Sequence, residues 1–323
     1  MRKSSFFGLT WNVFSVRVCL TLFIQTVPAQ QHGAEAGVVV RLRRLQGYST
    51  YNQQEETQMI QVNHLCKTYR VARRDGGLWH AVKALGKREM HEVRALDDLS
   101  FTIPKGEIAG YIGVNGAGKS TTIKVLSGIL VPDGGACTVN GRIPWKERRA
   151  HAADIGVVFG QRSQLWWDVP VADSFALLKD IYRVEDAAFR RSLEELTTLL
   201  ELGELLRTPA RQLSLGQRMR CEIAASMLHD PKVLFLDEPT IGLDAVSKLA
   251  VRDFIRHLNQ TRGTTVILTT HDMQDIEALA TRILLIGHGK LLLDGTFEDV
   301  RAADPDAHSL DELAAALYAR YGM

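Results

Sequence analysis

The sequence predicts an α/β protein with a parallel sheet, a phosphate-binding loop after one strand and an inserted helical subdomain. Three observations predict this class: a glycine-rich loop between an apolar strand and a helix in residues 108–130, two further apolar strands that end in acidic or imidazole side chains, and helical periodicity across residues 162–228. Apolar residues make up 46% of the 323-residue chain and charged residues 24%, which is typical of a globular protein.

Residues 1–58 differ in character from the rest of the chain. A basic start, an apolar stretch and small residues up to Ala29 resemble a secretory signal, but Arg17 interrupts the apolar run. We expect residues 1–58 to be a structureless upstream extension or a misplaced start, with the core beginning at Met59; a signal peptide is the alternative. No uninterrupted apolar run reaches the roughly eighteen residues of a membrane span, so we expect any membrane crossing to be made by another chain.

The first chemical motif is the glycine-rich loop. It follows the apolar run 108–112 and matches G-x-x-x-x-G-K-S from Gly113 to Ser120. Glycines let the backbone approach a polyphosphate, the lysine reaches the terminal phosphates and the serine hydroxyl binds Mg²⁺. A chance match is the alternative, and the flanking strand and helix argue against it. The predicted nucleotide contacts are Gly113, Asn115, Gly116, Ala117, Gly118, Lys119, Ser120 and Thr121.

The second motif is the end of the strand "KVLFLDEPT". Carboxylates at the tip of a strand of a parallel sheet lie at the edge where ligands bind. We therefore predict that Asp237 is a Mg²⁺ ligand and that Glu238 is the general base for an attacking water. Acidic residues at strand ends are often only solvated, but the phosphate loop earlier in the chain favours the catalytic interpretation.

Two further strand ends add polar groups. "TTVILTTHD" ends in His271, which we expect to hydrogen-bond a γ-phosphate, although a lone histidine at a strand end is more often structural. Gln161 follows the short apolar strand in "DIGVVFGQRSQ" and is predicted to bind Mg²⁺ and orient water. A plain surface glutamine is the alternative for Gln161.

A helix start is predicted at "LSLGQ", where Ser214 and Gln217 have the spacing of a capping box. Taken in order, the phosphate loop, Gln161, this segment, Asp237–Glu238, "IGLD" and His271 resemble the ATP-binding subunits of ABC transporters over residues 59–300. The resemblance implies a P-loop NTPase fold with a RecA-like sheet core, an inserted helical subdomain and a small antiparallel β subdomain. It also implies that Tyr69 stacks on adenine, for which a strand residue facing the core is the alternative.

The resemblance further implies that two subunits pair head to tail. In that family "LSLGQ" is the signature, and it closes over ATP held by the other subunit, so Ser214, Gly216 and Gln217 become nucleotide contacts. A helix N-terminus suits an incoming phosphate because its N–H groups are free and partially positive. Leu215 stands where the family usually has glycine, so the backbone there must suit a bulky residue. "LSLGQR" is similar to the branch that works with type-2 permeases in export.

Residues 70–94 form an unusual insertion with seven basic and three acidic residues. Leu78, Val82 and Leu85 share one face of a predicted amphipathic helix. A solvated surface helix is one interpretation, and contact with anionic lipid or the permease is the other.

The helical subdomain is predicted to span about residues 162–228. Trp166 and Trp167 follow Gln161 and either fill its core or anchor a helix of a membrane subunit. Residues 301–323 are predicted to form a helical tail, with Ser309 and Glu312 as its cap. The four cysteines, Cys19, Cys66, Cys137 and Cys221, show no metal or disulfide spacing and are expected to be reduced thiols.

Together these predictions describe an ATPase that uses ATP and Mg²⁺ to power transport, with export favoured, at the cytoplasmic face of the cell membrane. The expected partners are a second nucleotide-binding subunit, most simply an identical one, and separate integral-membrane permeases. Nucleic acid is not expected, because the net charge is only +2. One rival is a soluble ABC-type ATPase of repair or translation, and another is a module that binds ATP without cleaving it. The sequence does not identify the cargo.

Overall fold

The structure is a computed structural model that describes residues 58–72, 90–160 and 162–299, with isolated positions at 312, 315, 316, 318 and 319. Most of the predicted extension and tail, including Ser309, and residues 73–89 with Leu78, Val82 and Leu85 therefore lie outside the described residues. Among the helices of the described ranges, none has both the length and the hydropathy to cross a membrane.

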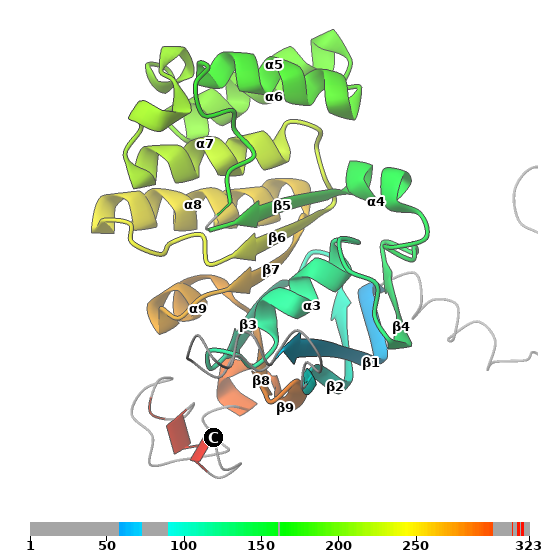
Figure 1. Cartoon of the computed structure of the whole chain (residues 1–323). Helices are drawn as coiled ribbons and strands as arrows, with labels where there is room; N and C mark the ends of the chain where they lie inside the picture. Colours follow the sequence, from blue (N-terminus) through cyan, green and yellow to red (C-terminus); the bar gives the residue numbers. More distant parts are fainter. Residues whose placement is uncertain are drawn as a thin grey trace, which may run out of the picture. The chain divides into compact units, whose positions relative to one another are not determined.

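A six-stranded sheet has the order β5-β6-β7-β3-β8-β9 (Figure 1). The first five strands run parallel and only β9 pairs antiparallel with its neighbour. The strands are β3 (Ile108–Gly113), β5 (Ile155–Phe159), β6 (Val233–Asp237), β7 (Thr265–Thr269), β8 (Arg282–Gly287) and β9 (Lys290–Gly295). This order brings the carboxyl ends of β6, β7 and β3 to one edge, although long stretches of chain separate them.

The strands are apolar on both sides because both faces of the sheet are covered. Along β6, Leu234 and Leu236 pack with one buried cluster, while Val233 and Phe235 pack with the other. The first cluster includes residues of the helices α5, α7 and α8, and the second includes residues of α3 and the smaller sheet (Figure 1). Because side chains of a strand alternate between the two faces of the sheet, the apolar residues of β6 contribute to both buried clusters.

The helices fall on these two sides. Helix α3 (Lys119–Leu126) follows β3, and α4 (Arg148–Asp154) precedes β5. The predicted helical subdomain contains α5 (Val171–Tyr182), α6 (Asp186–Leu199), two 3₁₀ turns at Leu205–Arg207 and Ala210–Gln212, and α7 (Leu215–Met227). Helices α8 (Ala245–Arg262) and α9 (Met273–Leu279) connect β6 to β7 and β7 to β8.

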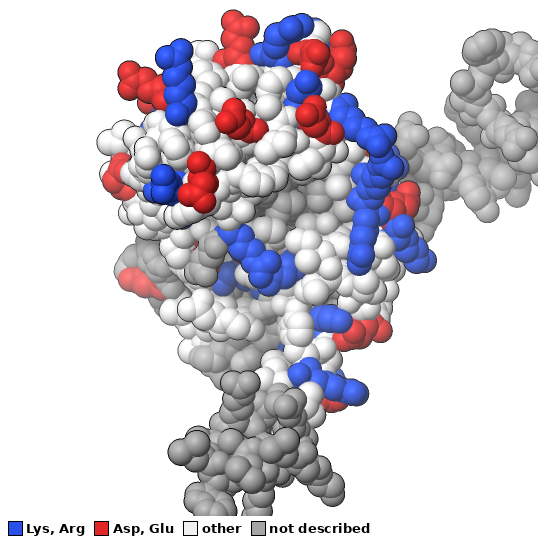
Figure 2. Space-filling view, turned by 45° about the horizontal axis from the view of Figure 1, so that its top comes forward, with Lys and Arg blue, Asp and Glu red and all other residues white. Residues whose placement is uncertain are grey.

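Acidic and basic side chains are interspersed around the helices at the top of Figure 2. Ion pairs near the surface include Arg262 Nη1 with Asp230 Oδ1 at 2.7 Å and Arg220 Nη1 with Glu201 Oε2 at 3.2 Å. Exposed pairs of this kind contribute only about 0 to 1 kcal/mol each, so the buried clusters rather than surface charge hold the helices on the sheet.

A second, antiparallel sheet has the order β2-β1-β4. Its strands are β1 (Gln58–Ala72), β2 (Met90–Pro104) and β4 (Gly134–Val139). The interpretation of residues 70–94 as one helical insertion is therefore wrong at both ends. Arg70 pairs with Glu92 and Ala72 with Met90, so these residues extend a β-hairpin. Strand β1 also begins one residue earlier than predicted, at Gln58.

Candidate active site

The phosphate loop connects β3 to α3 as predicted. Gly118 caps α3 with a φ of 112°, in the left-handed region that favours glycine. A Cβ atom on Gly118 would lie 2.4 Å from the carbonyl oxygen of Ala95, so any side chain there would displace backbone. The loop therefore depends on glycine for both its conformation and its close packing.

Lys119 is buried at the start of α3, where its Nζ donates to the carbonyl oxygens of Gly113 at 2.5 Å and Val114 at 3.3 Å. Burial lowers the pKa of Lys119, and the nearby carboxylates of Glu238 and Asp237 oppose that shift. The structure therefore brings Lys119 within electrostatic range of both acidic residues, more than a hundred positions later in the chain.

The ends of β6 and β7 are bonded to each other through Thr269. Its hydroxyl donates to Oδ1 of Asp237 at 2.7 Å, and the backbone N–H of Glu238 donates to the carbonyl oxygen of Thr269 at 3.0 Å. Glu238 has a φ of +57°, which is unusual for a residue with a side chain. Such conformations cost about 1 to 3 kcal/mol and concentrate at functional sites.

Glu238 also contacts the end of the neighbouring loop. Nε2 of His271 lies 2.7 Å from Oε1 of Glu238, and both side chains are partly exposed. A cavity of about 430 Å³ adjoins this pair and is lined by residues of both loops. The predicted base and the predicted γ-phosphate contact are thus direct neighbours, which strand order explains because β6 and β7 are adjacent.

A larger cavity, of about 590 Å³, lies elsewhere, beside Lys105, Lys232 and Thr264 at the amino-terminal ends of strands β6 and β7. None of the predicted site residues lines it. Ligands of parallel sheets bind at the carboxyl ends, so the smaller cavity beside Glu238 is the relevant one.

For two predicted site residues, Gln161 and Tyr69, the described part of the chain shows no contact with the rest of the site. Gln161 lies outside the described residues, although the N–H of the preceding Gly160 donates to the carbonyl oxygen of Asp237 at 2.8 Å. Tyr69 is half-buried in β1 and pairs with Val93 of β2. Its stacking on adenine stays a prediction.

The predicted capping box is present at the start of α7. The N–H of Gln217 donates to Oγ of Ser214 at 3.2 Å, and the N–H of Ser214 donates to Oε1 of Gln217 at 2.9 Å. Leu215 is the first residue of the helix, so its backbone has an ordinary helical conformation that accepts a leucine. A Cβ atom on Gly216 would lie 2.4 Å from Oγ of Ser247, so this glycine lets α7 approach the start of α8.

Residues 214–217 and the phosphate loop remain separate within one chain. Across the described ranges, no hydrogen bond links residues 214–217 to residues 113–121. Among the described residues, the start of α7 is therefore not hydrogen-bonded to the phosphate loop of the same copy.

Comparison with known proteins gives the family. The family model described as "ABC transporter" matches residues 96–241. The linearmycin resistance ATP-binding protein LnrL of Bacillus subtilis is 33% identical over 218 residues, which cover 68% of each chain. This chain belongs to the ATP-binding proteins of ABC transporters. The motifs of the phosphate loop and of β6 lie within the part that the family model matches.

Two further comparisons agree with this family. The daunorubicin resistance ATP-binding protein DrrA3 of Streptomyces coeruleorubidus is 36% identical over 65% of this chain, and the chain covers 66% of that relative's length. A solved structure described as an ATP-binding subunit of an ABC transporter superposes with a TM-score of 0.67, at 24% identity, over 80% of this chain and 99% of the other. The fold is thus that of ABC ATPase cassettes, a P-loop NTPase, and the relatives are drug-resistance members of the family.

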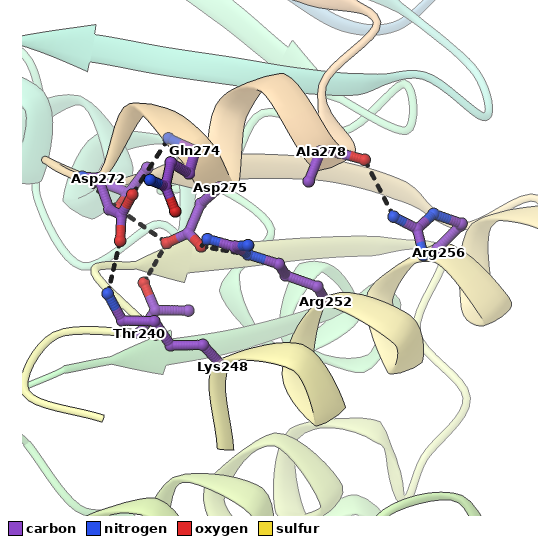
Figure 3. Close-up of polar contacts among 9 residues, drawn as sticks. Thr240, Lys248, Arg252, Arg256, Asp272, Gln274, Asp275 and Ala278 are labelled. Carbon is purple, nitrogen blue, oxygen red and sulfur yellow. Dashed lines mark hydrogen bonds and ion pairs between the residues drawn. The ribbon is translucent and has the colours of Figure 1, made fainter. Parts of the chain in front are cut away.

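Sequence reasoning missed the polar residues of this ABC protein that hydrogen-bond to the loops carrying Glu238 and His271. Thr269 accepts a hydrogen bond from the backbone N–H of Glu238, in the loop after β6. The buried Asp275 bonds Thr240 (Figure 3). It also bonds Thr270. The only signal in the sequence was the recurrence of threonine beside each acidic or imidazole residue, in "DEPT" and "LTTHD". Threonine is common in strands, so its spacing alone does not distinguish a ligand from an ordinary strand residue.

Proposed function

We propose that this ABC protein hydrolyses ATP, and that two copies bind each nucleotide between the phosphate loop of one copy and residues 214–217 of the other. The observation that carries the proposal is the contact between Glu238 and His271, within electrostatic range of the buried Lys119. A carboxylate, an imidazole and a lysine at the carboxyl edge of a parallel sheet are suited to positioning a terminal phosphate and the water that attacks it.

In the proposed reaction the water oxygen attacks the γ-phosphorus in line with the leaving group. The bond between that phosphorus and the β–γ bridging oxygen breaks, and ADP leaves with the electron pair. Glu238 accepts the proton of the water, and His271 holds the γ-phosphate and the Glu238 side chain in place. Lys119 stabilises the negative charge on the terminal phosphates, because its burial leaves it few competing water contacts.

The residues present also fit a magnesium ion. Ser120 offers a hydroxyl at the start of α3, and Asp237 uses Oδ1 for Thr269 while Oδ2 accepts no hydrogen bond from the described residues. Oxygen donors and few protein ligands are what Mg²⁺ prefers when it is shared with a nucleotide. Mg²⁺ would neutralise charge on the β- and γ-phosphates, with Gln161 as the further ligand expected from the sequence.

Pairing of two copies is supported by the surface around residues 214–217. Several large apolar side chains there are exposed, and Val246, on the first turn of α8, is 77% exposed. Exposed apolar residues around a polar centre are typical of a protein interface. The residues of this surface are Leu215, Ile241, Val246 and Leu249.

The test of hydrolysis is Glu238→Gln, which keeps the shape of the side chain and removes the base. We expect turnover to fall by about 10² to 10⁴ while the affinity for ATP stays within about twofold. In the presence of Mg-ATP this variant should form a dimer, measured by light scattering. Normal turnover would show that Glu238 is not the base, and a monomer at saturating Mg-ATP would contradict the shared nucleotide site.

We further propose that the ATPase acts at the cytoplasmic face of the membrane and powers export through separate permease chains. The two antibiotic-resistance relatives support this direction by their names. Trp166 and Trp167, 42% and 52% exposed, support a docking surface rather than core positions. The backbone N–H of Trp166 donates to the buried Ser174 at 3.1 Å, and Arg218 of α7 lies 5.8 Å from the ring centroid of Trp167. A pair of adjacent exposed aromatic rings is a suitable anchor for a partner helix.

The docking surface is tested by replacing Trp166 and Trp167 with serine and isolating the protein with its native membranes. We expect the double variant to lose membrane association while its ATP affinity is unchanged. Val131→Ser, at an equally exposed apolar residue after α3, is the control and should stay bound. If the wild type itself shows no membrane partner by photo-crosslinking from position 166 and mass analysis, the rival of a soluble ABC-type ATPase is favoured.

The segment 70–94, which has seven basic and three acidic residues and whose ends lie in the paired strands β1 and β2, extends this proposal to lipid. Among its described residues, Val71 and Met90 are each 52% exposed, and the same two strands carry Arg70 and Arg94, which are paired with Glu92 and Asp97. Apolar and cationic side chains together favour an anionic membrane surface. Co-sedimentation with vesicles of phosphatidylglycerol but not phosphatidylcholine is expected, and equal binding to both would contradict an electrostatic contact.

A further inference from the structure

Three basic side chains of α8 hold α9 and the loop before it (Figure 3). Nζ of Lys248 lies 2.5 Å from Oδ2 of Asp272, and Nε of Arg252 donates to Oδ1 of Asp275 at 2.5 Å. Nη2 of Arg256 donates to the carbonyl oxygen of Ala278 at 3.2 Å. The four-residue spacing on α8 keeps the three cations on one helical face.

Asp275, at the middle of this row, is the acidic residue whose carboxylate bonds two threonines, whereas Asp272 contacts Thr270 only through its backbone N–H, at 3.0 Å. The carboxylate of Asp275 is 0% exposed, and its second oxygen, Oδ2, accepts from the hydroxyl of Thr240 and from that of Thr270 at 3.2 Å. Thr240 and Thr270 are themselves buried. A buried charge with this many donors is fully compensated, so it fixes the positions of its partners.

The two threonines belong to the two loops of the candidate site. Thr240 lies two residues after Glu238, and Thr270 directly precedes His271. One buried carboxylate thus bonds both loops whose side chains meet at 2.7 Å. Asp275 touches neither Glu238 nor His271 through the contacts shown, and it lies on a different element, α9.

We propose that Asp275 is a positioning residue that sets the geometry of the Glu238–His271 pair through Thr240 and Thr270. This inference rests on the proposed hydrolysis of ATP. When the threonine bonds are removed, the two loops can shift relative to each other, and the attacking water is held less accurately. Misplacement of a reacting group by about 1 Å lowers rates by up to about 10²-fold. Nucleotide affinity is unaffected, because no hydrogen bond or ion pair among the described residues joins Asp275 to the phosphate loop.

The experiment uses the full chain with Thr240→Val and Thr270→Val together. Valine keeps the shape of threonine, and the ion pair between Asp275 and Arg252 remains, so no buried charge is left unpaired. We expect kcat to fall by about tenfold and the affinity for Mg-ATP to change by less than about twofold, measured well below the unfolding temperature. Asp275→Asn should lower kcat at least as much, although it also leaves Arg252 without its partner.

Thr265→Val is the matched control. Thr265 is a buried threonine that accepts a hydrogen bond from the N–H of Gly106 at 2.8 Å, but it lies at the opposite end of β7. The Thr265→Val substitution should lower the free energy of unfolding without lowering kcat. Arg256→Gln removes the third contact of the row and should also leave kcat unchanged.

A second readout separates positioning from general loosening. In a His271→Ala background the two valines should have little further effect on single-turnover hydrolysis, because the pair they act through is already broken. An equal loss in both backgrounds, or an unchanged kcat in the double valine variant, overturns the inference. Failure of Glu238→Gln to slow hydrolysis overturns the proposed function instead, so the two failures are distinguishable.

Discussion

The sheet edge that carries Lys119, Glu238 and His271 is held together by residues far apart in the sequence, whereas the start of α7 is held by its own first turn. Glu238 and His271 belong to the loops that follow β6 and β7 and meet at 2.7 Å, and Glu238 has a left-handed backbone. Ser214 and Gln217 satisfy each other three residues apart, with Ser214 exposed and Gln217 half-buried. The first region is a strained, preorganised centre, and the second is a stable local motif presented at the surface.

This difference predicts that substitutions in the two regions fail in different ways. A change at the sheet edge should remove binding or chemistry in a single copy. A change at the start of α7 should leave a single copy able to bind nucleotide and should impair only the step that needs a second copy. Variants at Lys119 and Ser214 test this division, and a variant at a buried histidine outside both regions gives a comparison; the expected effects decrease in that order.

The strongest loss is expected from Lys119→Ala. Removing the only cation that the described phosphate loop buries should abolish ATP binding, a loss of at least about 100-fold in affinity, since a charge-assisted bond to phosphate contributes about 1.5 to 3 kcal/mol and the charge acts on several oxygens. Binding is measured by titration calorimetry. Lys124→Ala, on the same helix α3, is the control and should bind normally. Retained affinity in Lys119→Ala would refute the assignment of the phosphate loop.

A smaller and more selective effect is expected at Ser214. Ser214→Ala removes the cap and the hydroxyl, so the free energy of unfolding should fall by about 1 kcal/mol and turnover should fall as well. Ser214→Asp is equally good as a cap, but its charge repels a phosphate; stability should be retained while turnover and Mg-ATP-dependent dimerisation are lost. ATP affinity of the isolated copy should be unchanged in both variants. If Ser214→Asp dimerises and turns over normally, α7 does not face a nucleotide.

The weakest expected effect is a pH dependence of the free energy of unfolding, and it arises from histidines outside both regions. Nε2 of the buried His151 lies 2.8 Å from the carbonyl oxygen of Leu126, at the end of α3, and burial lowers the pKa of His151. His229, stacked on Tyr182 at 3.9 Å, also has a pKa lowered by burial. Below about pH 6.5 the unfolded chain binds these protons more readily than the folded chain, so stability should fall as pH decreases from about 7.5 to about 5.5.

Urea unfolding at several pH values measures this slope, which is at most about 1.4 kcal/mol per pH unit for each histidine. His151→Gln keeps a donor for Leu126 and removes the titration, so its slope should be smaller than that of the wild type. An unchanged slope would mean that His151 is protonated equally in both states. ATP hydrolysis need not follow this pH dependence, because neither histidine bonds to Lys119, Glu238 or His271 among the described contacts.

Several parts of the fold and site were predictable because they depend on neighbouring residues. The phosphate loop, the apolar strand that ends at Asp237, the apolar strand just before His271 and the capping box at Ser214 are each encoded within fewer than ten positions. Residues 70–94 were expected to form one helical insertion, but both ends of the segment lie in strands. The sequence of the segment shows helical periodicity, whereas it does not show that its two ends pair with each other. Arg70 and Glu92 are joined by a cross-strand register that no local pattern displays.

The sequence alone determined which chemical groups this protein carries and which short elements present them, since loops, caps and strand ends follow from local spacing. Tertiary structure decided which groups meet. The order β6-β7-β3 places Glu238 beside His271 and both within electrostatic range of Lys119, and α9 brings Asp275 under the two loops. These contacts join residues tens of positions apart, and only the packing of the sheet and its helices selects them from the many pairings that the same local patterns allow.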